Sequence, residues 1–323
     1  MASTIDTIVT VFGGSGFIGR HVVRALAKRG YRIRAAVRRP DLAGHLQPLG
    51  RVGQIMAVQA NIRYPASVEA AVRDAAIVIN AVGAHVESGA QRFEAVHHAG
   101  AAAVAAAALS VGARLVHVSG IGADAASSSR AARAKAGGEK AVLAAVPAAT
   151  ILRPSVVFGP EDQFTNRFAA LARMLPLLPL IGGGASRLQP VFVGDVAAAI
   201  ADAAEGKART GSVYELGGPD VLTMRQIQTY VLKTIERSRP LVPLPFALAS
   251  LKAAFLQFAP QPLQLTPDQV ELLRADNVVS AEAASAGRTL EGLGITPTRL
   301  ETVAPSWLWR FRKTGQFQHT ADA

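Results

Sequence analysis

The chain of 323 residues contains no cysteine and few charged or aromatic residues. Without cysteine it can form no disulfide, hold no iron–sulfur cluster or thiolate zinc site, and use no thiol nucleophile. It also lacks an apolar run of the roughly 18 uncharged residues that a spanning helix needs. Half of the residues are hydrophobic and 18% are charged, which argues against disorder. This length suffices for one large α/β domain or for a nucleotide-binding domain with a smaller lobe.

Acidic residues are scarce as well. The 34 Lys and Arg outnumber the 23 Asp and Glu, which gives a formal net charge of +11. Such a balance favours anionic lipid, an acidic protein surface or nucleic acid as a partner. No basic run is interleaved with aromatic residues in the manner of a base-stacking surface, so we expect no nucleic-acid partner. The first residues lack a basic-then-apolar targeting pattern, which predicts a cytoplasmic protein.

A glycine-rich stretch lies close to the start of the chain. Residues 9–19 read V-T-V-F-G-G-S-G-F-I-G and run directly into a helical pattern over 20–28. A strand, a tight glycine turn and a helix N-terminus in this order form a pyrophosphate site, because a bare backbone lets phosphates approach the helix amides. A turn that needs glycines for packing alone is the alternative. The predicted cofactor contacts in this stretch are Gly13, Ser15, Gly16, Phe17, Ile18 and Gly19.

The end of the second predicted strand, over 31–37, indicates which cofactor is bound. Arg38 and Arg39 follow this strand, about 20 residues beyond the glycines, and no acid precedes Asp41. A carboxylate at this place would bind a ribose 2′-hydroxyl, whereas arginine accommodates a 2′-phosphate. The sequence therefore favours NADP(H) over NAD(H).

Further strands are predicted over 54–60, 75–80, 113–118 and 148–152, with a long helix over 92–111. This alternation predicts an α/β fold with a Rossmann-type doubly wound parallel sheet. Residues that follow the strand ends are expected to contact the cofactor: Asn61, Ile62, Ala81, Val82, Gly83, Ser119, Pro154 and Val156. The alternation breaks down later, so we expect a Rossmann core over 1–160 and a mixed smaller C-terminal α/β lobe with a tail over 161–323, interleaved as one structural unit.

Several motifs together resemble the extended and atypical short-chain dehydrogenase/reductases. They are G-G-S-G-F-I-G, V-H-V-S, I-L-R-P-S-V-V-F-G-P, Q-P-V-F-V-G-D and Y-E-L-G-G-P. Within that superfamily the chain looks most like the nucleotide-binding accessory subunits of respiratory complex I and their bacterial relatives. Its segments 265–280 and 306–317 resemble the C-terminal signature of those subunits. The resemblance implies a tightly bound, structural NADP(H), complex I subunits near the quinone-binding region as partners, and a peripheral place on the cytoplasmic face of the bacterial inner membrane.

One residue of the superfamily's chemistry is missing. Active members use a Tyr-x-x-x-Lys pair on the helix after the fifth strand, and the tyrosine moves the proton that accompanies hydride transfer. Lys135 matches the lysine, but Ala131 stands four residues before it, and no tyrosine lies between 65 and 213. A positioned general acid is worth about 10² to 10⁴ in rate, so we expect no catalytic residue here. Lys135 and Ser119 would remain as vestigial groups that contact the cofactor.

Other acid–base and metal candidates are weaker. Glu161 and Asp162 could supply a base, but an acidic pair at this place more often caps the following helix, and Asp195 is expected to cap a helix over 196–204.

The histidines offer little more. His85 could reach a nicotinamide edge, although a loop histidine is more often a surface polar residue. His97 and His98 are adjacent and cannot both face one metal from a helix, so no metal site is expected.

The segment 241–260 is apolar, but its helical part between two prolines is too short to span about 30 Å of hydrocarbon. Its large side chains share one face, as in a helix that lies in a membrane interface, and a buried core helix is the alternative. They are Phe246, Leu248, Leu251, Phe255 and Phe258. A tail with Trp307, Trp309, Arg310, Phe311, Arg312 and Lys313 allows the same two interpretations. We favour contact with the membrane surface for both.

Three functions stay open from the sequence. The favoured one is a non-catalytic NADP(H)-binding accessory subunit associated with respiratory complex I. The second is an active NADP(H)-dependent reductase that acts on a quinone or an isoprenoid intermediate with an acid other than tyrosine. The third is a redox-sensing regulator that binds NADP(H) and changes partners.

Overall fold

The computed structural model describes residues 6–314, and the chain divides into two compact units. The first unit runs to Pro154 and also contains Val193–Leu216 and Val279–Thr296. The second contains Ser155–Phe192, Gly217–Val278 and the described residues from Pro297 onward. The chain therefore passes between the units several times.

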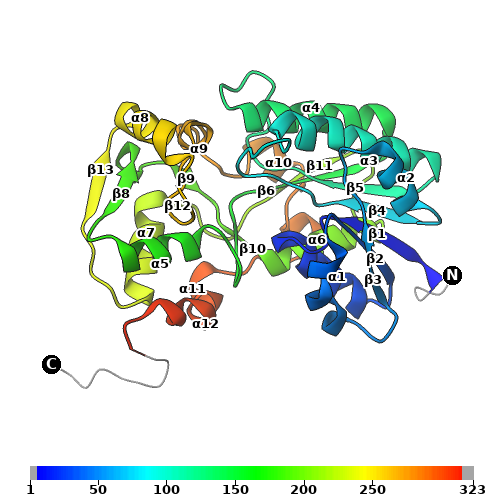
Figure 1. Cartoon of the computed structure of the whole chain (residues 1–323), viewed down its shortest axis with the longest axis horizontal. Helices are drawn as coiled ribbons and strands as arrows, with labels where there is room; N and C mark the ends of the chain where they lie inside the picture. The colour runs from blue at the N-terminus through cyan, green and yellow to red at the C-terminus, as the bar shows by residue number, and fades with distance from the viewer. Residues whose placement is uncertain (1–5, 315–323) are drawn as a thin grey trace. The chain divides into compact units, whose positions relative to one another are not determined.

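A seven-stranded parallel sheet forms the centre of the first unit (Figure 1). Its strands are β1 (Ile8–Phe12), β2 (Arg32–Val37), β3 (Ile55–Gln59), β4 (Ile77–Asn80), β5 (Arg114–Val118), β6 (Thr150–Pro154) and β11 (Val213–Leu216). They lie in the order β11-β6-β5-β4-β1-β2-β3. This confirms the expected doubly wound sheet and adds β11, which the sequence did not reveal as a strand. The strand order reverses between β1 and β4, and ligands bind outside the carboxyl ends of the strands at such a point.

Helices cover both faces of this sheet (Figure 1). One face carries α1 (Phe17–Lys28) and α6 (Val193–Ala204), and the other carries α2 (Pro65–Val72), α3 (Ala99–Ser110) and α4 (Arg130–Ala145). The short α10 (Ala281–Ser285) also belongs to the first unit. A π-helical turn over Glu94–His98 precedes α3 and together with it fills most of the predicted long helix. Because α6 begins at Val193, Asp195 lies inside its first turn, which corrects the predicted start at 196.

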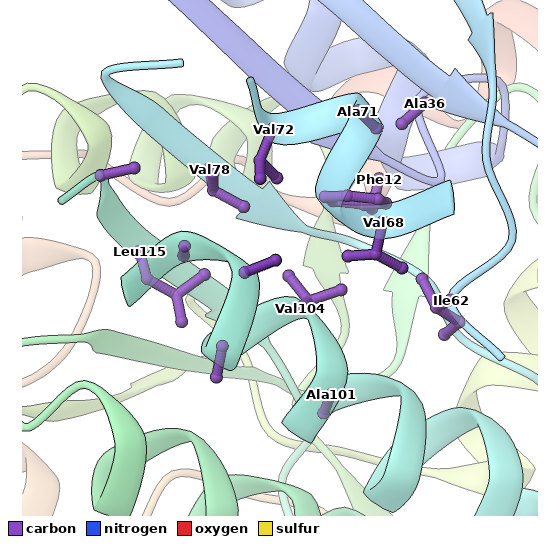
Figure 2. Packing of buried hydrophobic residues seen from close by; sticks show 14 of the residues in the cluster. Phe12, Ala36, Ile62, Val68, Ala71, Val72, Val78, Ala101, Val104 and Leu115 are labelled. Carbon is purple, nitrogen blue, oxygen red and sulfur yellow. The ribbon is translucent and has the colours of Figure 1, made fainter. Parts of the chain in front are cut away.

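Small apolar side chains fill the space between the sheet and the helices α2 and α3 (Figure 2). Phe12, Val78 and Leu115 from the strands pack with Ala101 and Val104 of α3, and all five are almost completely buried. Burial of one such valine or leucine side chain contributes about 1.5 to 3 kcal/mol. Alanine on α3 lets helix and sheet approach closely, so the strand ends that carry the site are held in place.

The second unit is a smaller mixture of short strands and helices. Its strands are β7 (Val157–Phe158), β8 (Leu178–Ile181), β9 (Arg187–Leu188), β10 (Val191–Phe192), β12 (Leu222–Thr223) and β13 (Leu241–Leu244). Its helices are α5 (Thr165–Met174), α7 (Met224–Thr234), α8 (Phe246–Leu256), α9 (Pro267–Leu272), α11 (Leu300–Val303) and α12 (Pro305–Leu308). Within the signature segment 265–280, Thr266 and Gln269 form a capping box that starts α9.

Residues of the tail that was expected to contact a membrane pack and bond within the second unit. Trp307 is buried, and its ring stacks on that of Phe158 at a centroid distance of 6.4 Å. Arg310 donates to the Pro160 carbonyl at 2.8 Å, and Arg312 forms an ion pair with Glu236 at 3.0 Å. The packing interpretation therefore holds for Trp307, whereas membrane contact of the exposed Arg310 stays a prediction. Residues 315–317 of the predicted signature lie outside the described residues.

The helix α8 has an unusual distribution of side-chain size. Its small residues Ala249 and Ala253 are buried against Val270 of α9, whereas its large residues face outward. The exposed fractions are 50% for Leu248, 61% for Leu251, 75% for Phe255 and 85% for the following Phe258. Phe246 differs, because it lies under the guanidinium of Arg274, 4.6 Å from the ring centroid. Across residues 6–314, no helix combines the length and the apolar character needed to cross a membrane.

Candidate functional site

The glycine turn after β1 has a backbone that other residues could not adopt. Gly13 has φ +77°, and a Cβ on it would lie 2.9 Å from the carbonyl oxygen of Ala81. A Cβ on Gly19 would lie only 2.0 Å from the Gly13 oxygen, so α1 starts in direct contact with the turn. Gly16 is the N-cap of α1, and no side chain of the described residues caps that end. The first amides of α1 are therefore available to an anion such as a pyrophosphate.

The other residues predicted at this turn lie where expected along it. The carbonyl of Ser15 accepts a hydrogen bond from the Arg20 guanidinium at 3.3 Å. Phe17 opens α1 and meets the His21 ring edge-on at 6.0 Å, and Ile18 is half-buried. These contacts fix the turn against the first helical turn.

The end of β4 meets the glycine turn at the point where the strand order reverses. The amide of Ala81 donates to the Phe12 carbonyl at 3.0 Å, and the amide of Val82 donates to Oδ1 of Asn80 at 3.2 Å. Ala81 and Val82 thus lie against Gly13, while Gly83 is exposed beyond them. The structure therefore brings together two backbone segments that the sequence predicts as cofactor contacts.

The two arginines after β2 differ in their partners. Arg39 forms an ion pair with Asp41 at 2.7 Å, which raises the pKa of the arginine and lowers the pKa of the carboxyl. Arg38 is exposed and forms no ion pair with any described residue. It lines a hollow of about 240 Å³ at the ends of β2 and β3. Arg38 is therefore the arginine whose charge faces the hollow without a carboxylate partner among the described residues, whereas Asp41 engages Arg39.

The hollow beside Arg38 is also lined by Gln59, Ala60, Asn61, Tyr64 and Ser67. Asn61 shapes this wall, because its Oδ1 accepts from the Arg63 amide at 3.2 Å. Ile62 points into the core, with 6% of its surface exposed. The sequence interpretation missed Gln59, Tyr64 and Ser67, although their position at the end of β3 and the start of α2 was a usable signal.

The carboxyl ends of the sheet strands form the predicted cofactor crevice. Ser119 and Lys135 lie at its far end from Arg38, beyond β5. The amide of Ser119 donates to the Leu152 carbonyl at 2.8 Å, but its hydroxyl oxygen is buried and finds no partner among the described residues. The Lys135 ammonium lies beside the backbone of Gly120, 2.7 Å from where a Cβ would stand. Pro154 ends β6 nearby, and its carbonyl accepts from the Ile121 amide at 3.0 Å. A buried hydroxyl without a partner is suited to a polar atom of a bound ligand.

The place of the missing tyrosine is filled by a small apolar cluster. Ala131 has 7% of its surface exposed and packs with Phe93 and Ala134, and Ala84 adjoins them. The Phe93 side chain is 3% exposed and is the one large side chain among the buried residues of this cluster. No proton-transferring group occupies this position.

Two buried histidines support the same end of the crevice. His97 Nε2 lies 3.0 Å from the Ala84 carbonyl, and His117 Nδ1 lies 3.2 Å from the Asn80 amide nitrogen. Burial, together with the nearby Lys135 charge, lowers the pKa of each histidine to about 4, so both are neutral at pH 7. His85 is exposed beside Ala84. Within residues 6–314, no group of three or more ligating side chains could hold a metal ion.

Of the predicted cofactor and acid–base residues, Val156, Glu161 and Asp162 lie in the second unit. The Asp162 carboxylate accepts from the amides of Phe164 and Asn166 at 2.8 and 3.0 Å and thereby caps the start of α5, as expected. Burial raises the pKa of this carboxyl. Val156, predicted as a cofactor contact, donates its amide to Oδ1 of Asn277 at 3.0 Å. Every other predicted contact belongs to the first unit.

Sequence comparisons extend these observations to known proteins. Residues 9–217 match the model of the NAD dependent epimerase/dehydratase family. The chain is 36% identical to NADH dehydrogenase (ubiquinone) 1 alpha subcomplex subunit 9, mitochondrial, of Arabidopsis thaliana, over 97% of this chain and 80% of that protein. It is also 36% identical to a ceramide reductase of Caulobacter vibrioides, over 61% of each chain.

A solved structure is similar in fold. The NADPH-dependent quinone oxidoreductase QOR2 of Escherichia coli, complexed with NADPH, superposes with a TM-score of 0.71 at 21% identity, covering 93% of this chain and 99% of that one. The glycine turn, the strand order and the matched family model agree with one another. The chain therefore belongs to the NAD dependent epimerase/dehydratase family, within which it shares nearly its whole length with the subunit 9 proteins of NADH dehydrogenase.

Proposed function

We propose that the chain is a non-catalytic accessory subunit of respiratory complex I that binds NADP(H) as a structural cofactor. The observation that carries the assembly is the similarity to subunit 9 of NADH dehydrogenase, which spans 97% of the chain. Partners are then the other subunits of that complex, near its quinone-binding region. The place that follows is peripheral, on the cytoplasmic face of a bacterial inner membrane.

The contrast between Arg38 and Arg39 supports NADP(H) as the cofactor. Arg38 offers its whole charge to a 2′-phosphate at the hollow, whereas Asp41 already neutralises Arg39. The turn at Gly13 and the first amides of α1 hold the pyrophosphate, and Lys135 and Ser119 hold the nicotinamide ribose. A cofactor bound only by the folded state, present at 100 times its Kd, would stabilise the fold by about 2.7 kcal/mol.

The nicotinamide end supports binding without turnover. When bound, the nicotinamide supplies a hydride, and reduction of a carbonyl needs a proton donor beside it. Ala131 has no proton to give, and it packs in an apolar cluster with Phe93. His97 and His117 are neutral and buried, so at pH 7 neither carries the extra proton of an imidazolium.

The outward face of α8 supports contact with the membrane surface. Leu248, Leu251, Phe255 and Phe258 recur at a helical period and are half or more exposed. A helix of a water-soluble protein normally buries such residues in the protein core. Because they are exposed here, this face is suited to a lipid interface.

Purification from native membranes tests the proposal. A tagged chain from detergent-solubilised membranes should elute with subunits of complex I and release NADP(H) when denatured. The isolated protein should not oxidise NADPH with quinone or carbonyl acceptors. A chain found only as a free cytosolic protein, or one with steady turnover, would contradict it.

A reductase is the second candidate, and the Ser119 hydroxyl favours it. That buried hydroxyl has no partner among the described residues, lies at the same end of the crevice as Lys135, and could bind a substrate carbonyl. One protein similar to this chain, from Caulobacter vibrioides, is named as an enzyme, a ceramide reductase. Substantial NADPH oxidation with a lipid ketone or a quinone, abolished by Ser119→Ala, would favour this candidate.

A further inference from the structure

A second hollow, of about 420 Å³, lies in the second unit where α7 ends and β13 begins. Its lining combines three cations with apolar side chains. The residues are Thr229, Leu232, Lys233, Glu236, Arg237, Ser238, Arg239 and Leu241. None of them belongs to the cofactor crevice of the first unit.

Backbone carbonyls fix two of the arginines of this hollow. Arg239 donates through Nε to the carbonyls of Ala172 and Leu175, at 3.0 and 2.9 Å, and so caps the C-terminal end of α5. Arg237 donates through Nε to the Phe311 carbonyl at 3.0 Å. Neutral carbonyls orient these guanidinium groups without cancelling their charge.

The cations of the hollow lack an internal counter-charge. Glu236 is the one acid of the lining, and Arg312 already pairs with it at 3.0 Å. Within the described chain, no carboxylate pairs with Lys233 or with Arg173, which follows Ala172 on α5. Burial and the charges of Arg239 and Arg173 lower the pKa of Arg237, so the cations repel one another. An anion from outside would relieve this repulsion.

Exposed apolar side chains lie beside these cations. Met174 and Leu177 follow Arg173 and have exposed fractions of 56% and 41%. Val242 is 41% exposed on β13, which pairs with β8 and so runs beside Leu178 and Pro179. A soluble phosphate would gain nothing from these residues, whereas a lipid offers both a phosphate and acyl chains.

We propose that this hollow binds the phosphate of an anionic phospholipid headgroup, with Arg173, Lys233, Arg237 and Arg239 around the phosphate. Met174, Leu177 and Val242 then enter the interfacial layer beside it. The inference rests on the proposed membrane contact of α8 and adds to it a selectivity for acidic lipid. The second unit binds the membrane through two terms, one apolar at α8 and one electrostatic at the hollow.

Vesicle cosedimentation of the full chain, loaded with NADPH, tests the proposal. The vesicles are phosphatidylcholine alone or phosphatidylcholine with phosphatidylglycerol. The variant Arg173→Gln/Lys233→Gln removes two exposed charges that the fold does not use. Each interfacial cation is worth roughly fivefold, so the variant should bind anionic vesicles about 25-fold more weakly and neutral vesicles as wild type does. The charge-conserving variant Arg173→Lys/Lys233→Arg should bind like wild type.

A matched control removes the same charge from the first unit. Arg24 and Lys140 are exposed there, so Arg24→Gln/Lys140→Gln should retain anionic-vesicle binding. Equal weakening by both double variants would overturn the proposal, because net charge alone would explain it. Loss of vesicle binding in a few millimolar inorganic phosphate, at constant ionic strength, would also overturn it in favour of a soluble phosphate.

A variant of α8 separates this inference from the membrane contact that it rests on. Leu251→Ser/Phe255→Ser should weaken binding to neutral and anionic vesicles alike. If wild type binds no vesicles, both the membrane contact and the lipid site fail. If wild type binds vesicles but does not prefer phosphatidylglycerol, only the lipid site fails.

Discussion

The two ends of the predicted cofactor crevice differ in the charge and polarity of their side chains. At the end expected to hold the adenosine, beside β2 and β3, Arg38 stands exposed over a hollow and has no carboxylate among the described residues to neutralise it. At the nicotinamide end, Ala131 and Phe93 form an apolar cluster, and two histidines are held neutral by burial. One end offers an exposed charge, whereas the position expected for a proton donor at the other end lies in an apolar cluster.

Because of this difference, one fold can bind a cofactor without the groups needed to turn it over. Binding of a dinucleotide depends mainly on the backbone turn, the helix amides and a cation for the phosphate, and all of these are present. In the proposed function, turnover lacks its proton donor, because Ala131 offers only a methyl group at the position expected for a tyrosine. Loss of a single side chain can therefore leave a binding protein whose cofactor acts only through stability.

Gly19→Ala should produce the largest effect, because it disturbs the turn that serves both ends. Its Cβ would lie 2.0 Å from the Gly13 carbonyl oxygen, so α1 or the turn must move. We expect a loss of about 4 kcal/mol or more in the free energy of unfolding, and no measurable NADPH binding by calorimetry. Gly44→Ala is the matched control, because nothing lies within 4 Å of its Cβ. Equal behaviour of the two variants would contradict a packing role for Gly19.

The sequence predicted the backbone of the site better than its side-chain environment. The turn at Gly13 and the order of the strands follow from local patterns, because chain order and glycine spacing dictate them. That Asp41 neutralises Arg39 and spares Arg38 depends on a loop geometry that no spacing encodes. Phe93 reaches Ala131 only through the fold, and α8 reverses the usual rule by burying its small residues.

His117 tests the closed end through the dependence of stability on pH. Its pKa is about 4 in the fold against 6.5 for a free histidine, so the unfolded chain takes up a proton that the folded chain does not. The stabilisation is therefore complete above pH 6.5 and is lost as pH falls from 6.5 towards 4. The full loss is about 3 kcal/mol for this histidine. Urea unfolding between pH 7.5 and 4 should show this fall in the free energy of unfolding. In His117→Gln the fall should be smaller by about 3 kcal/mol.

The exposed His45 supplies the control for that series. His45→Gln should keep the pH dependence of wild type, because its side chain is exposed. If His117→Gln keeps the full slope as well, the buried histidine is not the group that titrates.

Arg38→Gln tests the open end, with Arg39→Gln as its matched partner. A charged hydrogen bond to phosphate is worth about 2 kcal/mol, so Arg38→Gln should weaken NADPH binding about 30-fold and leave NADH binding nearly unchanged. Arg39→Gln should change either affinity by less than about threefold, because Asp41 already holds that guanidinium. Calorimetric titration of both cofactors measures the four ratios. Equal losses for NADPH and NADH in Arg38→Gln would show that Arg38 does not read the 2′-phosphate.

Ala131→Tyr should have the smallest effect, because Phe93 denies the new ring its space. We expect a loss of order 1 kcal/mol from overpacking, unchanged NADPH affinity and no gain in turnover. Removal of the Phe93 ring in Ala131→Tyr/Phe93→Ala should make room for the tyrosine, which stands one helical turn from Lys135 on α4. NADPH oxidation with a quinone acceptor should then rise by about 100-fold over wild type, at the lower end of what a general acid contributes. If Ala131→Tyr alone gives the same activity, the closed end lacks only its acid, and the apolar cluster around Phe93 does not block chemistry.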